Sequence, residues 1–420
     1  MCTAFSGSTG YKKMAGTKKN QRNKPFQTFS LRHLDVTLIA LIVILNCIGI
    51  AAIGSAEPSL QTRQAQGMLA GIVLMLFLSA VDYRRIVRFG WLWYIAAIVG
   101  LSLVFTPLGV ARDSAYRWIN VGMQLQPSEL AKILLILFYA KFIMTYKSRV
   151  RQYVWVILGF AFAVPPLLLI YEEPDLSTMI MVFVIIAAIL FVSGLSMKFV
   201  AAVFAIAVPA LIIVVTMVEQ GTADFLTTYQ QNRILAWLHP EDYSTTTAYQ
   251  TMNSIMAIGS GQLTGKGYNT NEISSLLNSG YISESQTDFI FTVIGEEFGF
   301  IGSVAVVILL ALIAIRCYLI ARTAKDEAGT IIAVGMGTWI GFQGFLNIAV
   351  ATGVFPNTGI PLPFVSYGLT SLLSLYMGVG FVLNVRMQTF RKPQAEGMLR
   401  FYQDQDSDRQ QLGAAVRPLL

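Results

Sequence analysis

The residues best suited to acid–base chemistry are acidic side chains in and around one apolar segment. Residues 284–302 read ESQTDFIFTVIGEEFGFIG, with Asp288 at the start of the apolar run and Glu296 further along it. A carboxylate at the edge of hydrocarbon is costly unless it pairs or faces water, so an acid here predicts a functional site. Thr287 and Asp288 also suit a helix N-cap, and this alternative explains the same residues.

A second polar stretch lies upstream, between two apolar segments, and reads AYRWINVGMQLQPSELAK. Its candidate functional residues are Arg117, Trp118, Glu129 and Lys132. Pro127 fits the first turn of a helix that carries the last two of them. The stretch predicts a charged site at a membrane surface, but an interfacial tryptophan and a snorkelling lysine would look the same.

Residues 170–178, IYEEPDLST, gather three acids at a turn between apolar segments: Glu172, Glu173 and Asp175. Carboxylate oxygens are the ligands that Mg²⁺ prefers, which makes Asp175 the candidate ligand of a divalent cation such as Mg²⁺ or Mn²⁺. A helix cap formed by Asp175 or Ser177 is the alternative.

The long polar segment 219–286 holds two further cationic candidates. Arg233 and Trp237 fall within 229–243, which fits an amphipathic helix lying at the membrane interface. Residues 257–270 place Lys266 among several glycines, a composition that can turn backbone N–H groups towards phosphate oxygens. No strand is predicted before it, so it is neither a Walker A loop nor a Rossmann turn.

A last motif, TGVFPNTGIPLPFVSYG at 352–368, alternates prolines and glycines beside an apolar run. Irregular backbone at membrane depth is tolerated only when it is buried in protein or lines a water-filled cavity. With Asn347 and Tyr367 nearby, the motif predicts the wall of an outward-open cavity. A rigid re-entrant loop without a ligand is the alternative.

The composition determines which elements must position these residues. The chain has 420 residues, of which 55% are hydrophobic and 13% charged, and this balance is typical of an integral membrane protein. Three cysteines and two histidines leave little material for disulfide frameworks, histidine-rich metal sites or Ser/His/Asp triads. The apolar segments lie near 36–56, 67–81, 90–106, 128–146, 152–170, 176–195, 199–218, 287–315, 328–351 and 364–385.

The predicted fold is an all-α integral membrane protein, a polytopic bundle of ten transmembrane helices with a large extracellular loop, 219–286, between the seventh and the eighth. With both termini in the cytoplasm, 24 of the 30 Lys and Arg residues fall on the inner side, as the positive-inside rule requires. The predicted domains are a disordered basic cytoplasmic tail at 1–34, the membrane domain at 35–390 and a cytoplasmic tail at 391–420. The polar motifs then face outward.

Five motifs in this order resemble the RodA/FtsW family of bacterial shape, elongation and division proteins: RWINVGMQLQPSELAK, YEEPDLST, SIMAIGSGQLTGKG, ESQTDFIFTVIGEEFGFIG and TGIPLPFVSYG. The resemblance covers about residues 36–390 and is closer to the RodA branch. It implies a peptidoglycan glycosyltransferase that polymerises lipid II on the outer face of the bacterial cytoplasmic membrane, during cell elongation or division, together with a class B penicillin-binding protein. It implies no nucleic-acid partner.

The resemblance also implies roles for residues. Asp288 corresponds to the essential aspartate of the family, and Arg117, Trp118, Glu129, Lys132 and Arg233 lie in its conserved polar surroundings. Four positions depart from the family pattern: Gln286 where a His is usual, and Ser177, Gln262 and Leu369 where a Gly is usual. Because Gln286 cannot titrate, a proton relay through an imidazole is impossible here.

The expected mechanism is glycosyl transfer with inversion, with Asp288 as general base. Arg117, Lys132, Arg233 and Lys266 are the expected phosphate partners. Trp118, Glu129, Glu296 and Tyr367 complete the predicted substrate site. A transporter that flips lipid II or another polyprenyl-linked sugar is the alternative, because intramembrane acids also mark transport pathways. The outward bias of the polar motifs favours catalysis.

Overall fold

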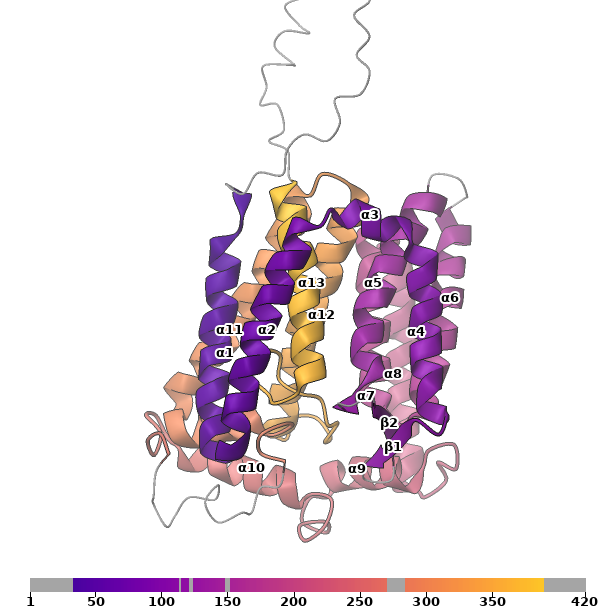
Figure 1. Ribbon diagram of the computed structural model, residues 1–420. Coiled ribbons are helices and arrows are strands. Elements are labelled where there is room, and N and C mark those ends of the chain that lie inside the picture. The colour runs from indigo at the N-terminus through magenta and orange to yellow at the C-terminus, as the bar shows by residue number, and fades with distance from the viewer. Residues whose placement is uncertain (1–32, 113–114, 121–123, 148–151, 270–283, 389–420) are drawn as a thin grey trace, which may run out of the picture.

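A helix occupies each of the ten predicted apolar segments in the computed structural model, which describes residues 33–112, 115–120, 124–147, 152–269 and 284–388 (Figure 1). These helices are α1 (Val36–Ala56), α2 (Pro58–Ala80), α4 (Gly90–Ser102), α5 (Pro127–Tyr146), α6 (Gln152–Glu172), α7 (Leu176–Val192), α8 (Met197–Glu219), α11 (Ile290–Thr323), α12 (Glu327–Ala351) and α13 (Leu369–Met387). Nearly all of the two predicted tails lies outside the described residues.

Judged by the length and composition of the residues that the structure describes, six of these helices can cross a membrane: α1, α2, α6, α11, α12 and α13. Shorter apolar stretches lie at 90–105, in α4 and the turn after it, at 176–192 in α7, and at 208–219 within α8. Helix α5 is of similar length but carries Glu129, Lys132 and Lys141. The architecture is therefore that of an α-helical membrane protein.

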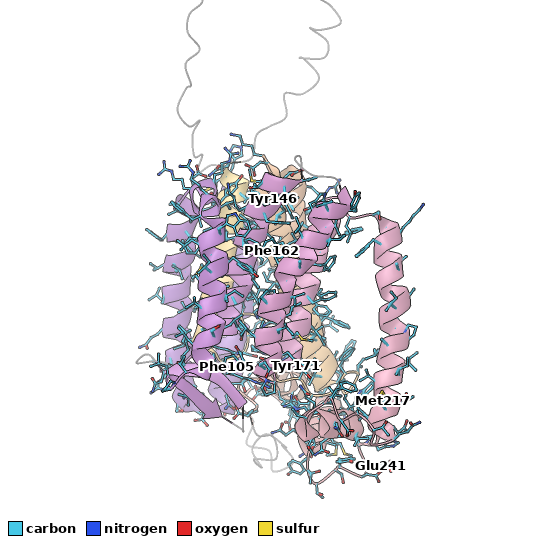
Figure 2. All side chains as sticks on the ribbon, turned by 90° about the vertical axis from the view of Figure 1, so that its right-hand side faces the viewer. Phe105, Tyr146, Phe162, Tyr171, Met217 and Glu241 are labelled. Carbon is cyan, nitrogen blue, oxygen red and sulfur yellow. The ribbon has the colours of Figure 1, made fainter. Side chains whose placement is uncertain are left out.

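Helix α12 is the centre of the bundle. It packs against α11 and α13 on one side and against α5 and α7 on the other, and so joins two groups of helices (Figure 1). Its Trp339 is among the largest fully buried side chains of the chain. Figure 2 shows α8, which carries Met217, standing apart from the other long helices.

The two ends of the bundle differ. The short helix α3 (Tyr83–Arg88) lies at the end where α1 begins and α13 finishes, which we call the α3 end (Figure 1). The other end, the loop end, carries α9 (Thr228–Leu238), α10 (Tyr249–Ser260) and a small sheet. Helix α9 confirms the helix predicted within 229–243, and it starts with a capping box of Thr227 and Gln230.

The small sheet was not predicted. Strands β1 (Gly109–Arg112), β2 (Ala115–Asn120) and β3 (Gln124–Leu125) pair antiparallel in the order β1-β2-β3, after the 3₁₀ turn Leu103–Phe105. The strands are too short to show a clear alternation of apolar and polar residues, so the sequence signal is weak. The sheet nevertheless matters, because β2 carries Arg117 and Trp118.

Helix α11 differs from its prediction in three ways. It starts at Ile290 rather than at residue 287, it ends at Thr323 rather than near residue 315, and it contains a break at Gly299, where φ is +63° and ψ is −158°. The break separates residues 290–298, which we call the outer half-helix, from the rest of α11. Asp288 lies in the turn just before this half-helix.

Candidate functional site

Asp288 lies in a turn, residues 284–289, and its side chain is half-buried. The N-cap of α11 is Phe289, and no side chain caps the helix there. The alternative in which Thr287 or Asp288 caps this helix is therefore wrong for this structure. A Cβ atom added at Gly359 would lie 3.3 Å from Asp288 Oδ2, so the carboxylate lies beside the proline- and glycine-rich motif.

The backbone around Asp288 is held by three residues from two segments, the loop at 352–368 and helix α12. The carbonyl oxygens of residues 286, 287 and 288 accept hydrogen bonds from the backbone N–H of Tyr367 (2.8 Å), the hydroxyl of Ser366 (2.5 Å) and Nδ2 of Asn347 (2.7 Å). Asn347 Nδ2 also donates to the carbonyl of Ile360 at 2.7 Å. One amide group therefore joins the Asp288 turn to the motif at 352–368.

Lys132 and Glu129, both predicted as substrate-site residues, form an ion pair in the protein interior. Lys132 Nζ lies 2.6 Å from Glu129 Oε1 and 3.1 Å from Gln343 Oε1, and it sits 4.6 Å from the centre of the Trp339 ring. Gln343 Nε2 donates in turn to the carbonyl of Pro361 at 2.8 Å. Because Lys132 is only 2% exposed, it supports the loop beside Asp288 in this structure and does not face an open surface.

Arg117 links the sheet to the turn between α6 and α7. Its Nε donates to the carbonyl of Glu173 at 3.2 Å and its Nη2 to the carbonyl of Pro174 at 2.5 Å. Arg117 and the neighbouring Trp118 are both half-buried. The guanidinium has further N–H groups, so these two bonds do not exhaust its donors.

Asp175 is the N-cap of α7, which confirms the capping alternative. Its Oδ1 accepts the backbone N–H of Thr178 at 3.0 Å and its Oδ2 accepts the hydroxyl of Thr178 at 2.9 Å. Across the described residues, no group of three or more His, Cys, Asp or Glu side chains is arranged to hold a metal ion. Both oxygens of the Asp175 carboxylate are therefore occupied by Thr178, and the divalent cation at this turn stays a prediction.

Ser177, one of the departures from the family pattern, has a defined contact. Its hydroxyl donates to the carbonyl of Thr358 at 2.6 Å. The start of α7 is thereby tied to the same loop that Asn347 and Gln343 hold from α12. A glycine at this position would lack that bond.

Glu173 is fully buried, at 0% exposure, and neither of its carboxyl oxygens has a hydrogen-bond partner. Burial and, to a smaller extent, the nearby Asp175 carboxylate raise the pKa of Glu173, Arg117 opposes both effects, and the net result is a rise from 4.5 to about 9. Glu173 is therefore a neutral carboxylic acid at pH 7.

The remaining two cationic residues, Arg233 and Lys266, contact different groups of residues. Arg233 is half-buried on α9 and lines a pocket of about 70 Å³ together with Trp237, Thr251 and Asn357. Lys266 Nζ lies 2.9 Å from Glu296 Oε1, and these two side chains are 11% and 0% exposed. The ammonium of Lys266 is thus paired inside the protein, and the structure gives its predicted phosphate contact no support.

Two residues that hold the site were not predicted, Gln343 and Ser366. The available signal was position, because Gln343 and Asn347 lie one turn apart on an otherwise apolar helix and so share a face. Asn347 is part of the sequence prediction, and a polar residue one turn before it on the same face of the helix indicates Gln343. Ser366 offered no such signal within its irregular loop.

Comparison with known proteins matches residues 27–391 to the family described as cell cycle protein, the family of FtsW, RodA and SpoVE. The probable peptidoglycan glycosyltransferase FtsW of Geobacter metallireducens is 30% identical over 84% of this chain and 95% of its own length. The peptidoglycan glycosyltransferase MrdB of Escherichia coli is 32% identical over 86% of this chain and 95% of its own length.

Solved structures agree. A chain from a study of how a peptidoglycan synthase complex coordinates polymerisation and crosslinking superposes with a TM-score of 0.70 at 28% identity, covering 86% of this chain and 99% of the other. The rod shape determining protein RodA of Thermus thermophilus gives 0.62 at 26% identity, covering 86% and 98%.

The buried acid predicts a pH-dependent stability. Glu173 holds its proton in the folded protein up to about pH 9 and releases it near 4.5 when unfolded, so its contribution to stability is lost as pH rises through this window. The stability of Glu173→Gln relative to wild type should therefore rise between pH 6 and 9, by at most about 1.4 kcal/mol per pH unit. The measurement is the apparent Tm of the purified protein against pH.

The matched control is Glu172→Gln, because Glu172 is the adjacent acid and is exposed. Its Tm should follow that of wild type at every pH. Parallel Tm curves for wild type and Glu173→Gln would contradict the buried neutral acid.

Proposed function

The chain belongs to the cell cycle protein family of FtsW, RodA and SpoVE, and from this premise we propose that it polymerises lipid II with Asp288 as general base. It is a peptidoglycan glycosyltransferase, as are the relatives reported above by name. None of those relatives is named as a transporter, so the comparisons do not favour a flippase.

The proposed reaction joins two sugars at the membrane surface. Asp288 takes the proton from the acceptor sugar hydroxyl while that oxygen attacks the anomeric carbon of the donor. The new glycosidic C–O bond forms on the face opposite the breaking bond, and the electron pair of the broken bond leaves with the polyprenyl pyrophosphate. The configuration at the anomeric carbon is inverted.

The observation that carries this role is the way the Asp288 turn is held. Each carbonyl of residues 286–288 accepts a hydrogen bond from Tyr367, Ser366 or Asn347, while the carboxylate is not needed as the cap of α11. A fixed backbone with a half-buried carboxylate is pre-organised, which supports positioning of a base against its substrate.

Arg117 and Arg233 are the proposed pyrophosphate partners. Both are half-buried at the loop end, where a lipid-linked pyrophosphate at the membrane surface would lie. A guanidinium binds phosphate oxygens through two N–H groups at once. Trp118 and Tyr367 are proposed to line the same site, while Lys132 and Glu129 act from beneath it through Gln343 and Pro361.

We further propose ten transmembrane spans with both termini in the cytoplasm and the loop end outside. The start of α1 and the end of α13 lie together with the arginine-rich helix α3 (Figure 1). Basic residues concentrate in cytoplasmic loops, and this topology puts 24 of the 30 Lys and Arg on that side. The active site then faces the outside of the bacterial cytoplasmic membrane.

A class B penicillin-binding protein, a transpeptidase that crosslinks the strands, is the proposed partner in cell elongation or division. The support is the likeness to a chain from a synthase complex that coordinates polymerisation with crosslinking.

Asp288→Asn tests the proposed function. Asn keeps the shape of Asp but cannot take the acceptor proton, so polymerisation of labelled lipid II by the purified protein should fall by about 10²-fold or more. The apparent Tm of the variant, measured beside activity, should stay within a few degrees of wild type. A stable variant with wild-type polymerisation would remove Asp288 from the role of base.

Single cysteines at the two ends test the topology. In a protein whose Cys2, Cys47 and Cys317 have been replaced, Glu241→Cys should react with a membrane-impermeant thiol reagent on intact spheroplasts, and Arg322→Cys should not. Glu241 lies at the loop end (Figure 2), and both residues are exposed. The reverse labelling pattern would place the site on the cytoplasmic side.

A further inference from the structure

The break in α11 is filled by the glycine-rich segment 261–269, which we call the plug. Four backbone hydrogen bonds join the two. The N–H groups of residues 300 and 301 donate to the carbonyls of residues 262 and 263 at 2.8 and 3.2 Å. The N–H groups of residues 266 and 267 donate to the carbonyls of residues 296 and 297 at 2.9 and 3.0 Å.

These bonds supply the hydrogen-bond partners that the backbone groups at a helix break lack. At Gly299 the regular hydrogen-bond ladder stops, and buried N–H and C=O groups left without partners would be costly. The plug supplies partners on both sides of the break. The plug therefore makes the break a rigid joint. The N–H groups of residues 266 and 267 donate to carbonyls of α11, so they are not available to bind a phosphate.

The contact is so close that it requires glycines. A Cβ atom at Gly261 would lie 2.0 Å from the carbonyl oxygen of Gly295, and one at Gly265 would lie 2.0 Å from the carbonyl oxygen of Glu297. Gly299 and Gly265 also have positive φ, +63° and +81°, where side chains are disfavoured. The glycines of both motifs thus serve one joint.

Side chains fasten the same joint. Glu296, which is 0% exposed, holds Lys266 at 2.9 Å. Glu297 Oε1 accepts the backbone N–H of Asn269 at 3.1 Å and the hydroxyl of Ser55, just before the end of α1. The Tyr268 and Phe298 rings stack with centroids 6.3 Å apart.

The outer half-helix is therefore fixed at both ends. Asn347, Ser366 and Tyr367 hold the turn that precedes it, and the plug holds its far end. Resting on the proposed function, we propose that the plug positions Asp288, and that Lys266 and Glu296 are positioning residues which do not touch the substrate. The substrate roles expected for these two residues are replaced by this one.

Charge reversal tests the proposal. Lys266→Glu and Glu296→Lys each place like charges in a buried site, and a shift of about 1 Å at Asp288 is enough to cost about 10²-fold in rate. Each single variant should lower kcat for lipid II polymerisation, per folded molecule, by about 10-fold to 100-fold with KM little changed. The double variant Lys266→Glu with Glu296→Lys restores the pair and should recover most of kcat.

A substrate contact gives a different pattern. If Lys266 bound pyrophosphate, Lys266→Glu would raise KM, and the double variant would not recover, because the charge would have moved away from the phosphate. Unchanged kcat per folded molecule in all variants would reduce the pair to a structural role. Either result overturns the proposal.

Hydrogen exchange of backbone amides tests the plug independently of the polymerisation activity. In wild type the amides of residues 266, 267, 300 and 301 should be protected; they should exchange faster in the single variants and regain protection in the double. Fast exchange of these amides in wild type would overturn the plug. If the amides are protected but the wild-type protein does not polymerise lipid II, the proposed function is wrong, and so is the positioning role. The hydrogen-bonded joint at Gly299 would still stand.

The matched control is the pair Lys147 and Glu327, which lies at the α3 end at 2.5 Å with side chains 35% and 51% exposed. Its single reversals, Lys147→Glu and Glu327→Lys, should leave kcat and the exchange of the plug amides unchanged. A loss of kcat equal to that at Lys266 would show a general effect of charge reversal and contradict the specific one.

Discussion

Buried backbone groups that are not in helices must find partners within the protein, and this constraint shapes the loop end of the molecule. Three stretches there lack regular helical bonding: the Asp288 turn, the loop at 352–368 and the break at Gly299. Where these groups are buried in the protein, no water replaces the missing partners. Asn347, Gln343 and Ser366 supply them for the first two, and the plug supplies them for the third.

The same constraint explains where the charges lie. Lys132 pairs with Glu129 and Lys266 pairs with Glu296, because a buried charge without a partner is costly. These cations support the backbone that surrounds the site. Arg117 also bonds backbone carbonyls, but it is half-buried and a guanidinium has donors to spare. Glu173 has no hydrogen-bond partner among the described residues, and burial keeps it neutral instead.

Much of the fold was predictable because its signals are local. Apolar runs indicate each long helix, and Pro127 marks the first turn of α5. Asp175 caps α7, which is one of the two roles that the sequence predicts for it. The sheet escaped prediction because its strands are short. The break in α11 escaped because a glycine inside an apolar run is as typical of close helix packing as of a broken helix.

The site was predictable in its residue types and less so in its pairings. Asp288, Glu129 and Lys132 were identified from chemistry and family resemblance, and the structure places the last two in contact. The partner of Lys266 was not identifiable, because Glu296 is distant in the sequence and no local pattern links the two. Likewise Gln343 on α12 accepts a hydrogen bond from Lys132 on the neighbouring helix α5, although the two residues are distant in the sequence. Tertiary contacts of this kind determine whether a lysine side chain is available to bind substrate or is paired with another side chain of the protein.

The most direct test of the account is a structure of the D288N protein with lipid II bound. Because this variant should bind substrate without turning it over, both sugars should be visible at the loop end. The account predicts that the side chain at position 288 lies about 2.6–3.2 Å from the acceptor hydroxyl, or one water away from it. A bound lipid II whose acceptor hydroxyl lies beyond that reach, or against another carboxylate, would contradict it.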